Sequence, residues 1–517
     1  MLTVMDWFCG AGGSSQGAHA VPGVTVTRAA NHWEMAIASH AANFPATDHY
    51  QGDIRTAPVH RWPVADLFWA SPECPKWSRA RGKRRDFHNT RQGSLFEVPG
   101  TARSAEDERS RALMEEVPLY LEGVAARGGR VLAGVVENVI DCRAWDAWNT
   151  WIGRIHALGY RTRIIALNSM HARPVRTPAA PQSRDRLYVA YWHESIGRTP
   201  DWDKWLRPKA WCPSCGQRID AVQVFKDPRR DMGRYRQQYL YRCPHTACRG
   251  AVVEPEVLPA AAAIDWSLPG TRIGDRDEPL ADATMERIRA GIARYWGPIL
   301  APAGGTWRDQ ASPINAPMPT RTTRENDGLA VPPLLVPVEG RDGKTASPAA
   351  LPLRTQTTRN ETGLAFPDAA GAFIAELRGG GSVARPVADA LATVTASGNH
   401  HGLVTAPDES GALLVPYYGT STACPAAQPV GALTTRDRYG LAHPGDAEAI
   451  DLDDVRFRML EPAEIGRAMA FGDGYRVLGN KRQRVRQYGN AVTPPVAEVL
   501  ISALVEAITG TDLEVAA

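Results

Sequence analysis

The sequence lacks the features that mark secreted and membrane-bound proteins. Eight cysteines in 517 residues are too few for a secreted disulfide scaffold, and no apolar run approaches membrane-spanning length. The first residues lack the basic and apolar pattern of a signal peptide. We therefore expect a cytoplasmic protein without membrane contact. The net charge is only +3, so any strongly basic surface must be local.

The sequence also lacks the G-x-G-x-x-G pattern of dinucleotide-binding dehydrogenases. It has instead a short apolar segment, Leu2–Phe8, followed at once by the glycine-rich stretch Cys9–Gly17. Glycines directly after a strand allow a tight turn and a close approach to a ligand, and the next helix offers its first amides. The pattern predicts a strand, a glycine turn and a helix, with or without a ligand.

Further apolar strands end in polar side chains. Val24–Ala30 leads to Asn31, a short turn carries Asp53, and the apolar run 129–136 delivers Glu137. Strands that alternate with helices predict an α/β fold whose parallel sheet binds ligands beyond the carboxyl ends of its strands. A carboxylate at such a place is partly desolvated and can hold a proton, although a surface acid or a helix cap is the commoner case.

Cys74 follows another apolar segment, Ala65–Ala70, and precedes the basic run Arg79–Arg85. Thiolates attack carbon well and their adducts reverse readily, so a cysteine here can be a nucleophile. A lone cysteine is otherwise commonly an inert, buried hydrophobe. The basic run is either a solvated loop or a source of phosphate contacts.

Seven segments in this order resemble the motifs of the DNA cytosine-5 methyltransferase family. They lie near the two ends of the chain and leave its middle uncovered. The segments are Asp6–Gly13, Gly52–Ile54, Ser71–Cys74, Glu137–Val139, Gln182–Arg186, Arg458–Ile465 and Gly489–Pro495.

The resemblance implies a doubly wound, Rossmann-like methyltransferase sheet that is discontinuous in sequence. It implies methyl transfer from S-adenosylmethionine to carbon 5 of a cytosine flipped out of double-stranded DNA. Cys74 would add to carbon 6 of the base, and Glu137 would stabilise the adduct at nitrogen 3. Arg184 and Arg186 would grip the base carbonyl or neighbouring backbone. The implied cofactor-binding residues are Phe8, Gly10, Gly12, Gly13, Asp53, Asn490 and Val492.

The sequence departs from the family beside the nucleophile. Glu73 and Pro75 stand where proline and glutamine are usual, and a negative charge next to Cys74 raises the pKa of its thiol. This keeps open an enzyme that acts on RNA or transfers a modified one-carbon group. A DNA-binding protein with a decayed active site is a third interpretation. The joint presence of Cys74, Glu137 and both arginines argues against decay.

Four of the cysteines have the spacing of a structural zinc site, so we expect the protein to bind zinc in addition to S-adenosylmethionine. Two cysteine pairs fit four thiolates around one ion, as in a zinc ribbon, and His245 is an alternative fourth ligand. Free or disulfide-bonded cysteines are the plainer interpretation. The basic flank between 226 and 242 favours a nucleic-acid partner. The predicted ligands are Cys212, Cys215, Cys243 and Cys248.

Four repeats, spaced by about 35 to 39 residues, follow the cysteines. In each, a threonine-rich run leads through a polar turn to a Gly-Leu pair, which predicts one β-hairpin per repeat, with disorder as the alternative. The Gly-Leu pairs begin at Gly328, Gly363, Gly402 and Gly440.

The expected domain order follows from these segments. A catalytic domain at 1–200 precedes a zinc-ribbon-like insert at 201–255 and a β-rich target-recognition region at 256–450. The segment 451–517 completes the catalytic domain. We expect a monomer that methylates DNA, as restriction-modification enzymes do.

Overall fold

The computed structural model describes residues 1–72, 105–258 and 461–516, parts of 260–285, and the backbone of short strands between 299 and 459. Cys74, its neighbours Glu73 and Pro75, and the basic run 79–85 lie outside the described residues.

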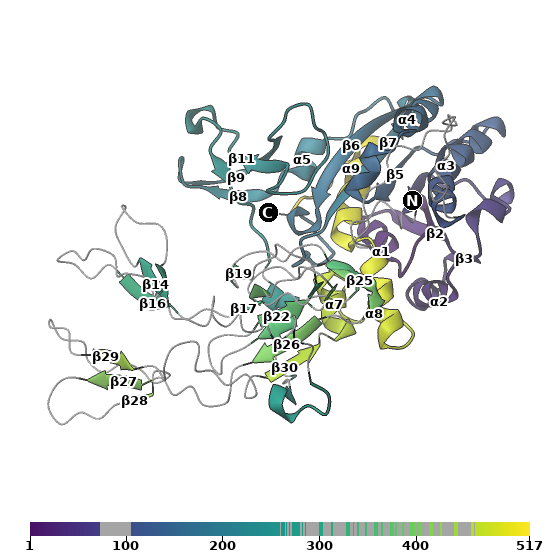
Figure 1. Cartoon of the computed structure of the whole chain (residues 1–517). Coiled ribbons are helices and arrows are strands. Elements are labelled where there is room, and N and C mark those ends of the chain that lie inside the picture. The colour runs from purple at the N-terminus through teal and green to yellow at the C-terminus, as the bar shows by residue number, and fades with distance from the viewer. Residues whose placement is uncertain are drawn as a thin grey trace, which may run out of the picture.

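A seven-stranded sheet forms the centre of the unit that is built from the two ends of the chain (Figure 1). Its order is β3-β2-β1-β4-β5-β7-β6, and β7 runs antiparallel to both of its neighbours while the other pairs described are parallel. The parallel-dominated sheet confirms the α/β expectation and is consistent with a Rossmann-like methyltransferase fold. The strands are β1 (Leu2–Trp7), β2 (Val24–Asn31), β3 (Asp48–Gln51), β4 (Leu67–Ala70), β5 (Ala133–Asn138), β6 (Tyr160–Asn168) and β7 (Asp185–His193).

Helices cover both faces of this sheet, because its strands are apolar on both sides. In β4, Phe68 packs in one core cluster together with residues of α3 (Ala105–Ala126) and α4 (Trp148–Ala157). Its neighbours Leu67 and Trp69 point to the opposite face and pack in a second cluster with residues of α1 (Gly13–Ala20) and α9 (Pro494–Thr509).

Helices α1 and α9 come from opposite ends of the sequence and touch directly. A side-chain carbon added to Gly13 would lie 1.9 Å from the carbonyl oxygen of Val492, and one added to Gly17 would lie 2.2 Å from that of Pro494. Two further helices, α7 (Pro462–Ala468) and α8 (Lys481–Asn490), precede α9. The 29-residue stretch Lys481–Thr509 is long and apolar enough to span a membrane, but 89% of its most apolar window is buried within the protein.

A small unit bearing the four cysteines follows the sheet. The short helix α5 (Trp202–Leu206) still packs in the core beside α9. Residues 209–256, called the cysteine module below, contain the hairpin β8–β9 and the antiparallel sheet β10-β11-β12. These strands are β8 (Lys209–Cys212), β9 (Gln217–Asp220), β10 (Val222–Phe225), β11 (Tyr239–Arg242) and β12 (Val252–Val253).

In the repeat region, one three-strand pattern recurs four times. An apolar strand pairs antiparallel on one side with a two-residue strand ending in proline, and on the other with the strand carrying the Gly-Leu pair. The four units are β14 (Ile299–Pro302), β15 (Ser312–Pro313) and β16 (Asp327–Ala330); β17 (Leu334–Leu335), β19 (Ser347–Pro348) and β21 (Gly363–Ala365); β22 (Phe373–Glu376), β24 (Arg385–Pro386) and β26 (His401–Thr405); and β27 (Leu413–Pro416), β28 (Cys424–Pro425) and β29 (Tyr439–Ala442).

In the second and third repeats, the predicted hairpin between the threonine run and its Gly-Leu strand is therefore wrong. The partner of the Gly-Leu strand is the apolar strand that begins the unit, since that strand offers both of its edges for pairing. In the second and third units the threonine runs form β20 (Gln356–Arg359) and β25 (Thr393–Gly398), which pair with each other in parallel. The threonine runs at 319–324 and 433–436 lie outside the described residues.

Candidate active site and four-cysteine cluster

The glycine turn between β1 and α1 is open on one side only. Phe8 and Gly10 have left-handed backbone conformations, with φ of 61° and 53°. A side-chain carbon added to Gly10 would have its nearest described neighbour 4.0 Å away. At Gly12 it would lie 2.3 Å from the hydroxyl of Tyr475, and Gly13 faces Val492. Of the three predicted cofactor glycines, Gly10 alone therefore has no described atom closer than 4.0 Å to such a carbon.

Behind the turn lies a buried polar chain that the sequence did not reveal. The Oδ2 atom of Asp6 accepts hydrogen bonds from the hydroxyls of Ser14 (2.6 Å) and Ser15 (2.7 Å). Burial raises the pKa of Asp6 to about 7, against the effect of these hydrogen bonds. Ser15 in turn contacts Nε2 of His40 at 2.9 Å, and Nδ1 of His40 contacts His49 at 2.8 Å. These residues come from separate elements, so no sequence spacing could have grouped them.

The ends of β2 and β3 carry the next predicted cofactor contact. The N–H of Gly52 donates to the carbonyl of Asn31 at 3.0 Å and joins the two strand ends. The Asp53 carboxylate, 24% exposed, pairs with Arg55 at 2.5 Å. The uncrowded side of Gly10 and the partly exposed acceptor at Asp53 fit S-adenosylmethionine, which has a cationic amino acid part and an adenine whose amino group donates hydrogen bonds.

Glu137 lies at the carboxyl end of β5 in a charged, partly buried setting. Its Oε1 atom is 3.2 Å from Nε of Arg186, and its side chain is only 12% exposed. It is also hydrogen-bonded to the Ser71 side chain. Burial raises the pKa of Glu137, and the charges of Arg186 and Arg184 and the Ser71 hydrogen bond oppose that rise. The structure thus brings together Glu137 and one of the two predicted arginines.

The first residues of the predicted nucleophile motif are fixed beside Glu137. The N–H of Ser71 donates to the carbonyl of Trp7 at 3.1 Å, and the Asn138 amide donates to the carbonyl of Pro72 at 3.3 Å. The chain is therefore anchored two residues before Cys74, which itself lies outside the described part.

Arg184 contacts the C-terminal segment. It is 3% exposed, and its Nη1 and Nη2 atoms donate to the carbonyls of Gly489 (3.2 Å) and Ala491 (3.0 Å). Burial lowers the pKa of Arg184 to about 9. Between the two carbonyls, Asn490 is exposed, whereas Val492 is buried. Of these two predicted cofactor residues, Asn490 offers the accessible side chain.

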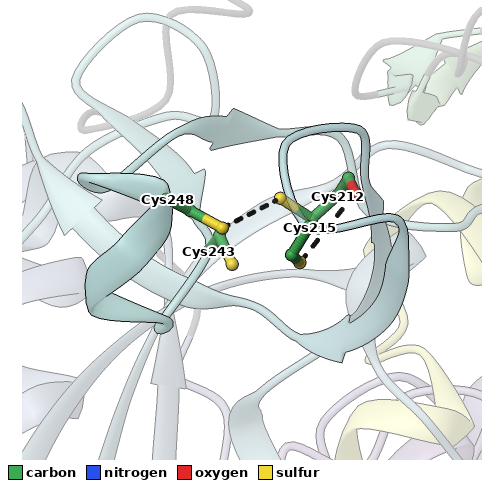
Figure 2. Close-up of side chains that lie close together, drawn as sticks. All are labelled: Cys212, Cys215, Cys243 and Cys248. Carbon is green, nitrogen blue, oxygen red and sulfur yellow. Dashed lines mark hydrogen bonds between the residues drawn. The ribbon is translucent and has the colours of Figure 1, made fainter.

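The four predicted zinc ligands converge in the cysteine module (Figure 2). Their sulfur atoms all lie within 4.8 Å of one another, and those of Cys212 and Cys248 are 3.9 Å apart. Tetrahedral zinc with bonds of about 2.3 Å would place its sulfurs roughly 3.8 Å apart. Sulfur donors at this spacing fit a zinc ion. His245 is exposed and outside the group, so Cys248 is the fourth sulfur donor.

The basic flank of the module is partly paired with carboxylates of the chain. Three of its arginines form ion pairs with carboxylates of the module or of the segment after β5. The Arg229 side chain nevertheless stays 89% exposed, and the expectation that the flank binds nucleic acid stays a prediction. The pairs are Arg229–Asp227 at 3.0 Å, Arg234–Asp141 at 3.2 Å and Arg236–Glu254 at 2.9 Å.

A parallel-dominated α/β sheet, with a glycine turn after β1 and carboxylates after β3 and at the end of β5, is consistent with the framework of a methyltransferase. The model of the C-5 cytosine-specific DNA methylase family matches residues 2–116 and 405–506 of the chain. S-adenosylmethionine is the methyl donor typical of that family. A search of curated proteins found no match.

Several solved structures are similar to the chain over most of its length. An Entamoeba histolytica methyltransferase, EhMeth, is 10% identical, covers 98% of each chain and has a TM-score of 0.43. A putative DNA modification methyltransferase from an E. coli prophage is 15% identical to the chain. The match covers 98% of this chain and 99% of that protein, with a TM-score of 0.41. The S. pombe Dnmt2 methyltransferase is 11% identical to the chain. The match covers 98% of this chain and 100% of that protein, with a TM-score of 0.44.

Proposed function

We propose that the protein is a DNA (cytosine-5)-methyltransferase that acts on a cytosine flipped out of double-stranded DNA. The observation that carries the proposal is the Glu137 carboxylate, paired with Arg186 and hydrogen-bonded to Ser71 three residues before Cys74. A partly buried carboxylate with a raised pKa can hold or share a proton, as a group that bonds a ring nitrogen must.

The proposed chemistry overcomes the low nucleophilicity of carbon 5 of cytosine. Cys74 loses its thiol proton, and its sulfur adds to carbon 6, so the 5,6 double bond breaks and carbon 5 gains electron density. Glu137 bonds to nitrogen 3 and stabilises the charge that the addition places on the ring. S-adenosylmethionine supplies the methyl group as a sulfonium. Carbon 5 forms a bond to that methyl group as the methyl–sulfur bond breaks, which leaves a neutral thioether. Loss of the carbon 5 proton to water then expels the Cys74 sulfur and restores the 5,6 double bond.

The remaining residues are proposed to bind and orient. Gly10 and Asp53 border the cofactor, with Phe8 and Asn490 as further contacts. Region 256–450 recognises the target, the insert at 201–255 holds a structural zinc ion, and 451–517 completes the catalytic domain. Arg184 supports the active site by holding the backbone of the C-terminal segment.

A second candidate keeps this site but acts on RNA or transfers a modified one-carbon group. Glu73 favours it, because this residue adds negative charge directly beside the nucleophile. A more negative surrounding lowers the thiolate fraction of Cys74 at a given pH, and a different substrate would have to offset that effect.

One assay tests both candidates. The zinc-loaded protein is incubated with S-adenosylmethionine and either unmodified DNA or RNA, and the nucleosides are analysed by mass. We expect 5-methylcytosine in DNA, absent with Cys74→Ser and retained with Cys142→Ser, a cysteine outside the site. Product in RNA alone would favour the second candidate, and product in neither would contradict methyl transfer from S-adenosylmethionine to either nucleic acid.

A further inference from the structure

Asp185 stands between the two arginines of the site and points away from them. It is buried at the start of β7, where successive side chains alternate between faces. Its Oδ1 atom accepts a hydrogen bond from the backbone N–H of Tyr235 (3.2 Å) and one from the hydroxyl of Tyr239 (3.0 Å). Both tyrosines belong to the cysteine module. The residue that separates Arg184 from Arg186 is therefore held by the module.

The same tyrosine is joined to the metal cluster through one short strand. Tyr239 begins β11, which ends at Arg242 and runs directly into Cys243. Tyr239 is fully buried, and the N–H of Cys243 donates to the carbonyl of Ala251 at 2.9 Å. Because a strand is stiff along its length, the position of Cys243 sets that of the Tyr239 hydroxyl.

The module also grips the segment that follows Glu137. Arg234 pairs with Asp141 at 3.2 Å, and the Asp141 side chain is 7% exposed. Arg143, two residues on, is bonded through Nε and Nη2 to both carboxylate oxygens of Asp231 at 2.9 to 3.1 Å. The module therefore contacts both chain segments from which the Glu137–Arg186 pair projects.

We propose that the cysteine module is a metal-dependent buttress of the Glu137–Arg186 pair, with Asp185 and Tyr239 as positioning residues. The inference rests on the proposed function for its catalytic consequence. A metal ion that joins the two cysteine pairs holds β11 in place, and β11 holds Asp185 and the arginines beside it. Without the ion, Asp185 would lose donors that satisfy its buried charge, and the pair would lose its fixed geometry.

Two tyrosines on the same face of β11 give a matched test. Tyr239→Phe removes the hydroxyl that donates to Asp185, and Tyr241→Phe removes a buried hydroxyl that is bonded to Gln223 instead. We expect Tyr239→Phe to keep its zinc and its KM for S-adenosylmethionine while kcat falls about 10- to 100-fold. In the pH profile of kcat, the limb that reflects ionisation of Glu137 should move to higher pH. The reason is that Arg186 lowers the pKa of Glu137, and a loosened Arg186 lowers it less. Tyr241→Phe should change neither, and equal loss in both variants would overturn the proposal.

Hydrogen exchange provides a readout that needs no turnover. Zinc is stripped from the full chain with a chelator and then restored with Zn²⁺ alone. Exchange at the amides of Arg184 and Cys142 should quicken at least about tenfold on stripping and recover on reloading, while β1 stays protected. Unchanged exchange at these two amides, or equal acceleration in β1, would overturn a local buttress. If exchange at these two amides depended on zinc but the protein transferred no methyl group, the proposed function would be contradicted and the buttress would still hold.

Discussion

Glu498 and Thr177 lie 321 residues apart in the sequence and share two hydrogen bonds: the Thr177 N–H donates to Oε2 of Glu498 at 2.7 Å, and its hydroxyl donates at 2.6 Å. The other carboxylate oxygen accepts the N–H groups of Val175 (2.7 Å) and Arg176 (2.8 Å). Glu498 is 2% exposed. This one buried side chain ties the C-terminal helix α9 to the loop before Arg184.

Glu498→Gln should destabilise the protein, because the amide places an N–H where the loop already presents donors. Hydrogen bonds to a charged, buried acceptor contribute about 1.5–3 kcal/mol each, so we expect a loss of roughly 3 kcal/mol or more in the free energy of unfolding. Urea denaturation measures it. Glu514→Gln, at an exposed position near the same end, is the control and should change little. Equal stabilities of the two variants would refute the assignment.

Gly13→Ala should separate α1 from the C-terminal segment, since the new carbon would lie 1.9 Å from the carbonyl oxygen of Val492. Overpacking of this kind costs about 1–3 kcal/mol or more, and binding of S-adenosylmethionine should weaken with it. Calorimetry of unfolding and of cofactor binding measures both. The matched control is Gly153→Ala in α4, where the added carbon meets no described atom within 4 Å. That change should stabilise the helix slightly, and a Gly13→Ala protein as stable as this control would contradict the close approach.

His171 should make the protein sensitive to acid. Burial, with a smaller effect of Arg236, lowers the pKa of His171 from 6.5 to about 3. The folded state then binds fewer protons than the unfolded state between these values, so stability falls as the pH drops below 6.5, by up to about 1.4 kcal/mol per pH unit. Its ring nitrogens have no hydrogen-bond partner among the described residues, so His171→Leu should flatten this slope at little cost. Parallel pH profiles of unfolding for the two proteins would count against the buried, neutral histidine.

Cys212→Ser should release the metal. Losing one of four ligands should lower zinc affinity by more than the ~100-fold that changes outside the coordination shell cost. Zinc per chain, measured by elemental analysis after dialysis, should fall well below one. Cys142→Ser alters a buried cysteine outside the cluster and should keep its zinc. If both variants retained the ion equally, the four-sulfur site would not be the one that binds it.

Local sequence patterns predicted the elements that follow local rules. The glycine turn after β1 and the acid at the end of β5 could be foreseen, since an apolar strand followed by glycines or a carboxylate has few structural outcomes. The cysteine spacing likewise predicted the four-sulfur cluster, because two short pairs can share one ion.

Contacts between distant segments could not be predicted in this way. Gly13 carries no side chain because Val492 lies against it, although a ligand seemed reason enough from the sequence. Asp185 was unremarkable until the structure placed Tyr239 beside it. The hairpins of the repeats were assigned to neighbours in the chain, whereas the Gly-Leu strands pair with apolar strands well upstream.

The packing of α1 and α9 on one face of the sheet also determines when the chain can finish folding during synthesis. Strands β1 to β7 leave the ribosome long before α9, whose residues pack over Trp69 and Val135 of the sheet. Chains are made from the N-terminus, so this apolar face is completed only when the last helix emerges. A nascent chain therefore carries an unfinished, aggregation-prone surface through most of its translation, and ribosomes that stall before residue 494 would release a product that cannot close its own core.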